Sequence, residues 1–138
     1  HSFSKKNVLR GIHFQYKNPQ SQLFYLASGK IYLVVVDFRP NSKTFLKKQS
    51  FILDSKKHEQ IYMSPGLGSG FLAISDKINL LYKVSKIFSR DNEIAVIWND
   101  PLLKINWPIK KPIISKKDLK NFYIEDIDFK KFKDLCKL

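Results

Sequence analysis

The stretch NVLRGIHFQ (residues 7–15) sets Arg10 and His13 three positions apart in an otherwise apolar run. A strand that only fills a core needs neither residue. Histidine titrates near neutral pH, so His13 is a candidate general base for removing a proton from a substrate. A single histidine in a strand is also commonly structural, and the residues alone leave both roles open. No second histidine or carboxylate lies within two strand positions of His13, so we expect no metal site there.

A histidine base needs a carboxylate that orients its ring and, in many reactions, a partner acid. Asp118, at the end of the motif SKKD, is a candidate for the carboxylate. Tyr82, in the run LLYKVS, is a candidate for the acid. Both have an ordinary structural alternative, because aspartate is frequent at helix N-termini and a strand tyrosine normally packs in a core.

The elements that must position these residues are predicted to be strands. Short runs of β-forming residues, separated by turn signals at intervals of roughly 8–12 residues, favour an all-β sandwich or barrel. The pattern changes near the end, where Ser115 is suited to cap a helix. Phe129, Phe132 and Leu135 follow at helical spacing. We therefore expect a short C-terminal helix packed on the barrel.

The composition favours one folded domain over residues 1–138, with 43% hydrophobic and 14% aromatic residues. No apolar run approaches the ~20 residues that a membrane-spanning helix needs. The single cysteine, Cys136, excludes an internal disulfide and fits a cytoplasmic protein. Because the chain begins with a histidine and soon enters a structured stretch, we expect a further N-terminal segment before it.

The formal charge of +13 comes from 25 basic and 12 acidic residues. One interpretation is a nucleic-acid binder, and the other is a lysine-rich solvated surface. Only Arg10, Arg39 and Arg90 are arginine, the residue that grips bases and phosphates in bidentate fashion. The lysines are scattered through turns, which favours the solvated surface and no nucleic-acid partner. Such a field still attracts an anionic substrate.

Six motifs, in order along nearly the whole chain, resemble the dTDP-4-dehydrorhamnose 3,5-epimerase family. They are NVLRGIHFQ, SGKIYLVVVDFRPNSKTF, MSPGLGSGFLAIS, LLYKVSKIFS, IWNDPLLKINWP and ISKKD. Each is weak alone, whereas six in order are specific. The resemblance implies a cupin-type jelly roll and a homodimer with shared or exchanged N-terminal strands. It also implies an isomerase that needs no cofactor or metal and acts on a nucleotide-linked sugar for polysaccharide biosynthesis.

The resemblance implies roles for single residues. A 4-keto-6-deoxy sugar has acidic hydrogens at carbons 3 and 5, because the carbanion is delocalised as an enolate. His13 matches the family's base, Asp118 the carboxylate that fixes its ring, and Tyr82 the acid on the opposite face. Arg10 matches an arginine near the diphosphate. Strand alternation would put Arg10 and His13 on opposite faces, so we expect Gly11 to bend the strand and bring both to one pocket.

Four further positions are predicted to bind substrate: Gln15, Gln22, Ser69 and Phe88. Gln22 and Ser69 depart from the family, which usually has a lysine and a histidine there, near the reacting sugar. An amide in place of a cation weakens the stabilisation of the enolate oxygen. Phe88 stands where the family often has a tyrosine that shapes the nucleotide end of the pocket.

Three functions stay open from the sequence. The first is an active epimerase of a nucleotide-linked 4-keto-6-deoxy sugar. The second is an epimerase of altered scope, which acts at one carbon only or takes another sugar or nucleotide, such as GDP. The third is a catalytically silent cupin that binds a sugar nucleotide.

Overall fold

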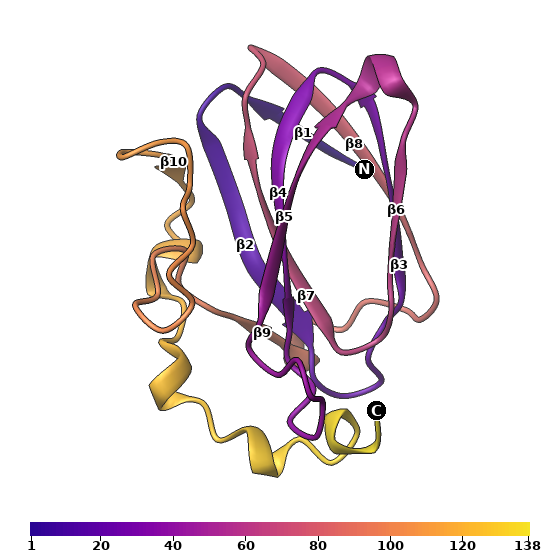
Figure 1. Cartoon of the computed structure of the whole chain (residues 1–138), viewed down its shortest axis with the longest axis vertical. Helices are drawn as coiled ribbons and strands as arrows, with labels where there is room; N and C mark the ends of the chain where they lie inside the picture. Colours follow the sequence, from indigo (N-terminus) through magenta and orange to yellow (C-terminus); the bar gives the residue numbers. More distant parts are fainter.

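The computed structural model describes residues 1–138 as two β-sheets packed face to face (Figure 1). The strands are β1 (Ser2–Lys5), β2 (Val8–Gln15), β3 (Gln22–Ser28), β4 (Lys30–Asp37), β5 (Lys48–Asp54), β6 (Gln60–Met63), β7 (Leu67–Ala73), β8 (Lys77–Val84), β9 (Glu93–Ala95) and β10 (Ile113–Ile114). One sheet has the order β1–β8–β3–β6, and the other has β10–β2–β7–β4–β5 with β9 beside β2. This architecture confirms the predicted all-β jelly roll.

Both faces of β4, an inner strand of the six-stranded sheet, are buried. Its β-branched and aliphatic residues alternate between two cores, as the period of two in a strand requires. Ile31 and Leu33 point into the barrel, toward residues of the four-stranded sheet such as Leu80. Val34 and Val36 point the other way and pack against residues that follow β9. The barrel therefore has an interior core and a second core on its outer side.

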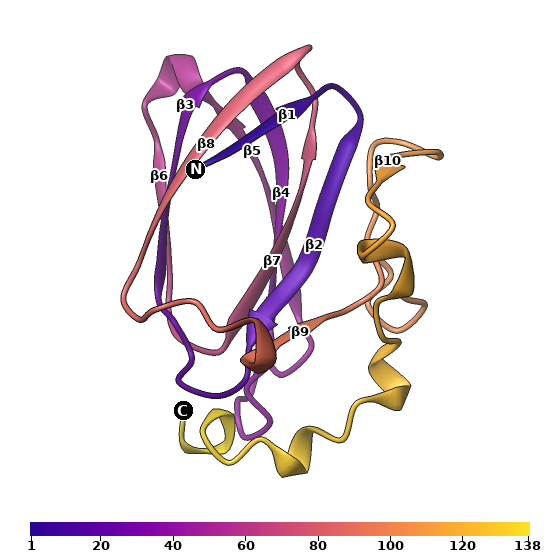
Figure 2. The ribbon, with the colours of Figure 1, turned by 180° about the vertical axis from the view of Figure 1, so that it is seen from behind.

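The chain after β9 covers that outer side, away from the four-stranded sheet (Figure 2). The helical structure predicted at its C-terminus is present as short 3-10 turns packed on the barrel, and not as one continuous helix. The six 3-10 turns of the chain are η1 (Ser55–Lys57), η2 (Arg90–Asn92), η3 (Asp118–Lys120), η4 (Ile124–Asp126), η5 (Phe129–Lys131) and η6 (Leu135–Lys137). None of these helical segments has the length or apolar character needed to cross a membrane.

The turns still bury the residues that were expected to pack on the barrel. Phe129 and Leu135 belong to the outer core, each within its own three-residue turn. Asp128 starts a separate turn because its carboxylate accepts a hydrogen bond from the backbone N–H of Lys130. A short isolated α-helix gains little free energy, so separate turns that each seat one side chain in the core are favoured here.

An irregularity in β2 decides which side chains enter the barrel. Arg10 lies opposite Phe71 of β7, and His13 lies opposite Ser69. Three steps on β2 therefore match two steps on β7, which is the definition of a β-bulge. Gly11 occupies the extra position with a φ of +100°. Because Phe71 and Ser69 share one face of β7, Arg10 and His13 also share one face, as the sequence predicts.

Gly11→Ala should lower the free energy of unfolding by about 2 kcal/mol or more. A Cβ atom at this position would lie 2.6 Å from both the Cα of Gly70 and the carbonyl oxygen of Ser69, and the backbone is in the left-handed region. Chemical denaturation measures the change, with Ser50→Ala on the exposed edge of β5 as the control. Equal stability of the two variants would contradict the need for glycine.

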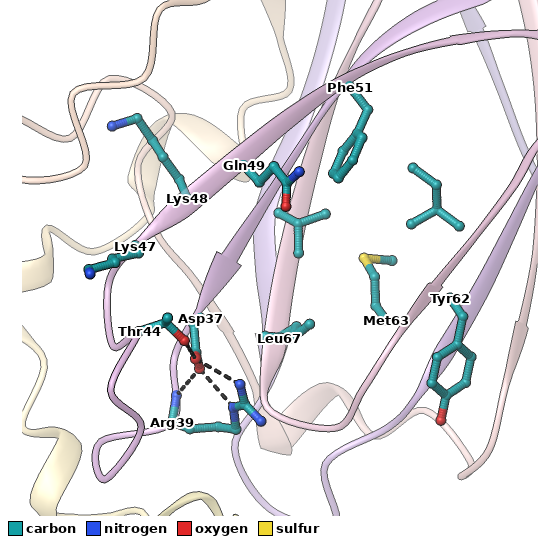
Figure 3. A pocket seen from close by; sticks show the side chains of 12 residues that line it. Asp37, Arg39, Thr44, Lys47, Lys48, Gln49, Phe51, Tyr62, Met63 and Leu67 are labelled. Carbon is teal, nitrogen blue, oxygen red and sulfur yellow. Dashed lines mark hydrogen bonds and ion pairs between the residues drawn. The ribbon is translucent and has the colours of Figure 1, made fainter.

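A buried carboxylate organises the loop that follows β4. Asp37 accepts hydrogen bonds from the backbone N–H and the guanidinium of Arg39, and from the hydroxyls of Ser42 and Thr44, at 2.7–3.0 Å. Burial alone raises the pKa of Asp37, but these hydrogen bonds outweigh burial and hold that pKa well below its usual range. Figure 3 shows the cluster at the rim of a cavity of about 430 Å³ between β5 and β6.

Asp37→Asn should lower the free energy of unfolding at neutral pH by roughly 1–3 kcal/mol, because the hydrogen-bond donors to this buried residue lose their charged acceptor. The pKa of Asp37 is lower in the folded state than its ordinary value of 3.8, so its ionised form stabilises the fold. That contribution is complete above pH 3.8 and is lost as the pH falls through this value toward the folded-state pKa.

The difference in stability between the wild type and Asp37→Asn should therefore shrink below about pH 4, as urea denaturation at several pH values will show. The matched control is Asp76→Asn, because Asp76 is exposed and lies 3.8 Å from Lys6. A difference that stays constant down to pH 2 would contradict the role given to the Asp37 carboxylate.

Candidate active site

A cavity of about 430 Å³ opens between the two sheets at the β2 side of the barrel. The six-stranded sheet contributes Arg10, His13 and Ser69, and the four-stranded sheet contributes Gln22 and Tyr82. The other residues that line it are Ser2, Gln20, Phe24, Phe71, Leu80, Val84, Phe88 and Glu93. The fold thus brings six of the eight residues singled out from the sequence to one cavity.

Asp118 contacts the His13 ring without lining the cavity. Nε2 of His13 lies 2.8 Å from Oδ1 of Asp118, across 105 residues of sequence. An ionised carboxylate only accepts hydrogen bonds, so Nε2 carries the ring proton. Nδ1 is then the basic nitrogen of the neutral ring, on the side of the ring that faces Glu93.

The turn that carries Asp118 is fixed locally. The backbone N–H of Asp118 donates to Oγ of Ser115 at 3.0 Å, which is the capping contact that the SKKD motif predicts. Burial alone raises the pKa of the Asp118 carboxyl, but hydrogen bonding and charge from His13, with hydrogen bonds from Ser115 and Asn121, outweigh it. The pKa of Asp118 therefore lies below its usual range, and the carboxylate stays ionised beside the ring.

Glu93 is a member of the site that was not singled out from the sequence. Its Oε1 lies 3.9 Å from Nδ1 of His13, and its Oε2 forms an ion pair with Nζ of Lys117 at 2.6 Å. Glu93 begins β9, which pairs with β2 and brings it opposite Gln15. In the sequence, Glu93 is only an acidic residue at the start of an apolar run, which is a weak signal for a site residue. Its place in the site depends on the pairing of β9 with β2, which no local pattern encodes.

Tyr82 lies on the wall that faces His13. It shares a face of β8 with the buried residues Ile78 and Leu80, so its ring turns into the barrel. The ring contacts Phe24 of β3 at 5.5 Å between centroids, which holds it in place. The hydroxyl makes no hydrogen bond within the chain, and 43% of the residue is exposed. A molecule in the cavity would therefore lie between the His13 ring and a free phenol.

Gln15 is not placed on the cavity, although it was predicted to bind substrate. Its Nε2 donates to the carbonyl oxygen of Asn18 at 2.8 Å, and its Oε1 accepts from the backbone N–H of Ser89 at 3.0 Å. Both ends of the amide are engaged by backbone groups because the side chain is buried between two loops. Gln15 thus supports the segment that carries Phe88.

No group of three or more histidine, cysteine, aspartate or glutamate side chains in the chain is arranged to hold a metal ion. The cavity instead presents a histidine with an ionised carboxylate on one wall and a free phenol on the facing wall. These are the parts of a site for proton transfer between two faces of a bound molecule. The fold is a cupin-type barrel whose cavity has a candidate base and a candidate acid on facing walls.

Comparison with known proteins identifies the family. Residues 1–126 match the family described as dTDP-4-dehydrorhamnose 3,5-epimerase, and the chain belongs to this family of isomerases. The enzyme of that name from Pseudomonas aeruginosa is 34% identical over 129 residues, which cover 93% of this chain and 71% of the relative. The one from Neisseria gonorrhoeae is 37% identical over 120 residues, which cover 86% of this chain and 37% of the relative.

Solved structures agree with this assignment. The Legionella pneumophila epimerase in complex with dTDP-4-keto-L-rhamnose has a TM-score of 0.88 and 30% identity, over 97% of this chain and 70% of that one. The Bacillus anthracis enzyme with TDP and PPi bound has a TM-score of 0.85 and 37% identity, over 89% and 71% of the two chains. The chain therefore spans about seven tenths of these structures, and 37% of the Neisseria relative.

Asp118→Asn should release the His13 ring from a single tautomer. The wild-type carboxylate only accepts a hydrogen bond, whereas a carboxamide both donates and accepts. We expect long-range ¹H–¹⁵N spectra of the neutral ring to show protonation at Nε2 in the wild type and a mixture in the variant. The exposed His58 is the internal control in both spectra. A wild-type ring protonated at Nδ1 would contradict the assigned geometry.

Proposed function

We propose that this protein epimerises a nucleotide-linked 4-keto-6-deoxy sugar at carbon 3, carbon 5 or both. The observation that carries the proposal is the pairing of His13 with Asp118 on one wall of the cavity and Tyr82 on the facing wall. A 4-keto sugar held between them exposes a C–H bond beside its carbonyl to a base on one face and an acid on the other. Membership of the epimerase family supports the same reaction.

The proposed steps balance as two proton transfers. Nδ1 of His13 takes the proton from carbon, and the electron pair of the C–H bond moves into the carbonyl to form an enolate. Asp118 stabilises the imidazolium that results. The Tyr82 hydroxyl then gives a proton to the opposite face of the same carbon, and the electron pair returns from the oxygen. Because Tyr82 is 43% exposed, water can restore its proton, and His13 releases its own to solvent.

Arg10 is proposed to hold the diphosphate of the substrate, and Phe88 is proposed to hold its nucleotide base. Arg10 is exposed at the cavity and pairs with no carboxylate, so its charge is free for an anion. The net charge of +13 draws such a substrate toward the protein. Phe88 is 55% exposed and lines the same cavity, where its ring offers a stacking surface for a base.

A second candidate is an epimerase of narrower or altered scope. Arg10 is the only lysine or arginine among the residues that line the cavity. Ser69 lies across the strand pair from His13, and Gln22 lies on the facing sheet, so both offer neutral donors near the reacting sugar. Weaker stabilisation of the enolate oxygen favours the more acidic carbon. This candidate acts at one carbon only, or takes another nucleotide such as GDP.

We also propose that the protein is a homodimer and works in the cytoplasm. The outer face of the four-stranded sheet carries exposed apolar residues on three strands, with Phe3, Tyr62 and Leu81 at 53%, 66% and 41% exposure. Such a patch suits a second copy of the chain. The single free cysteine, Cys136, fits a reducing compartment.

The test is hydrogen exchange at the sugar in deuterated water, followed by NMR. We expect dTDP-4-keto-6-deoxyglucose to lose its proton signals at carbons 3 and 5. Loss of one signal, or exchange only with a GDP-linked 4-keto sugar, would favour the second candidate. Absence of exchange with both substrates would contradict the proposed activity and leave a silent binding protein.

Two variants separate the base from the acid. His13→Asn should slow exchange by about 10²–10⁴-fold, because the proton acceptor is lost. Tyr82→Phe should still exchange the proton through His13 but should invert the carbon far more slowly, since no acid serves the opposite face. Tyr62→Phe, on the outer face of the same sheet, is the matched control. Full inversion by Tyr82→Phe would remove Tyr82 from the mechanism.

A further inference from the structure

A buried hydroxyl on β1 holds the arginine of the candidate site. Ser4 is 3% exposed, and its Oγ accepts a hydrogen bond from Nε of Arg10 at 3.0 Å. Nη2 of Arg10 donates to the carbonyl oxygen of Phe3 at 3.5 Å. Both contacts come from β1, and both leave the guanidinium charge without a counter-ion.

Arg39 illustrates an arginine with a purely structural role. Arg39 donates from Nε and Nη2 to the two carboxylate oxygens of Asp37 at 2.9 and 2.8 Å (Figure 3). The charge of Arg39 is therefore cancelled by its partner. Arg10 also donates from Nε and Nη2, but its two acceptors are neutral, so its charge stays available to a ligand.

The contact with Ser4 also selects which edge of the guanidinium is available. A guanidinium binds phosphate oxygens either through Nε and one Nη, or through both Nη groups. Ser4 engages Nε of Arg10, and the carbonyl oxygen of Phe3 engages one N–H group of Nη2, so Nη1 and the second N–H group of Nη2 are left for a ligand. A flexible arginine loses side-chain entropy when it binds, and a contact that orients it beforehand lowers this cost.

Strand β1 connects this arginine to the wall that carries the acid. Ser4 pairs with Ile78 of β8, the strand that also carries Tyr82. Ser2 of β1 itself lines the cavity. A substitution at Ser4 therefore acts directly on the side chain of Arg10, on the side of the cavity where β1 and β2 meet.

We propose that Ser4 is a positioning residue, which fixes Arg10 so that its two terminal nitrogens capture the diphosphate of the nucleotide-linked substrate. The inference rests on the proposed function, because that function supplies the diphosphate. It adds a residue that acts through Arg10 and touches neither the sugar nor the reacting carbon. Ser4 should thus govern nucleotide affinity and leave proton transfer by His13 unchanged.

The test is calorimetric titration of dTDP, and separately of GDP, into the wild type, Ser4→Ala, Arg10→Ala and the double variant. Ser4→Ala should weaken binding of the preferred nucleotide roughly tenfold, as expected for loss of one hydrogen bond to a charged group. The same change in the Arg10→Ala background should have no further effect, because Ser4 acts through that side chain. Ser4→Thr, which keeps a hydroxyl, should restore most of the affinity.

Ser28→Ala, an exposed serine on β3, is the matched control. Thermal unfolding of each variant checks that the fold is kept. In the exchange assay, Ser4→Ala should raise KM by a similar factor while kcat stays within about twofold of the wild type.

Unchanged affinity in folded Ser4→Ala, or an equal loss in the Arg10→Ala background, would overturn the inference and leave the proposed function standing. A drop in kcat with KM unchanged would also overturn it. Failure of the wild type to bind either nucleotide would contradict the proposed function, and the inference with it.

Discussion

The extra residue at Gly11 is the constraint on which the candidate site depends. In a regular antiparallel pair, the residue two positions after Arg10 would enter the barrel opposite Ser69, and that residue is Ile12. The bulge exchanges the two faces, so His13 points into the cavity and Ile12 joins the outer core, where it is fully buried. The β-bulge at Gly11 therefore puts Arg10 and His13 on one wall of the cavity, which regular strand alternation would not do.

The same exchange couples the outer core to the chemistry. Ile12 and Phe14 pack against the segment after β9, which includes Phe129 and Leu135. That segment also carries Asp118 to the His13 ring from 105 residues away. Apolar packing on one face of β2 thus anchors the segment that carries Asp118, while the ring that Asp118 orients lies on the other face of β2.

The strands could be predicted from the sequence, because alternation and turn residues are local signals. The shared pocket of Arg10 and His13 could be predicted only from Gly11, because regular alternation would put the two residues on opposite faces. The division of the C-terminal helix into separate 3-10 turns could not be predicted, since Phe129, Phe132 and Leu135 recur every third residue, and this spacing fits successive 3-10 turns at least as well as an α-helix. The position of Glu93 in the site could not be predicted, because its place beside His13 depends on the pairing of β9 with β2. Such pairing is decided by packing across the whole sheet.

The distribution of charge separates attraction from catalysis. The net charge of +13 lies almost entirely outside the cavity. Arg10 is the only lysine or arginine among the residues that line the cavity. A field of this kind raises the rate of encounter with an anionic substrate, but it is screened by salt and falls off across the surface. An enolate formed between His13 and Tyr82 depends instead on donors within hydrogen-bond distance. Ser69 and Gln22 line the cavity and are the neutral candidates for that role in the proposed reaction, whereas the surface lysines lie too far away to supply such donors.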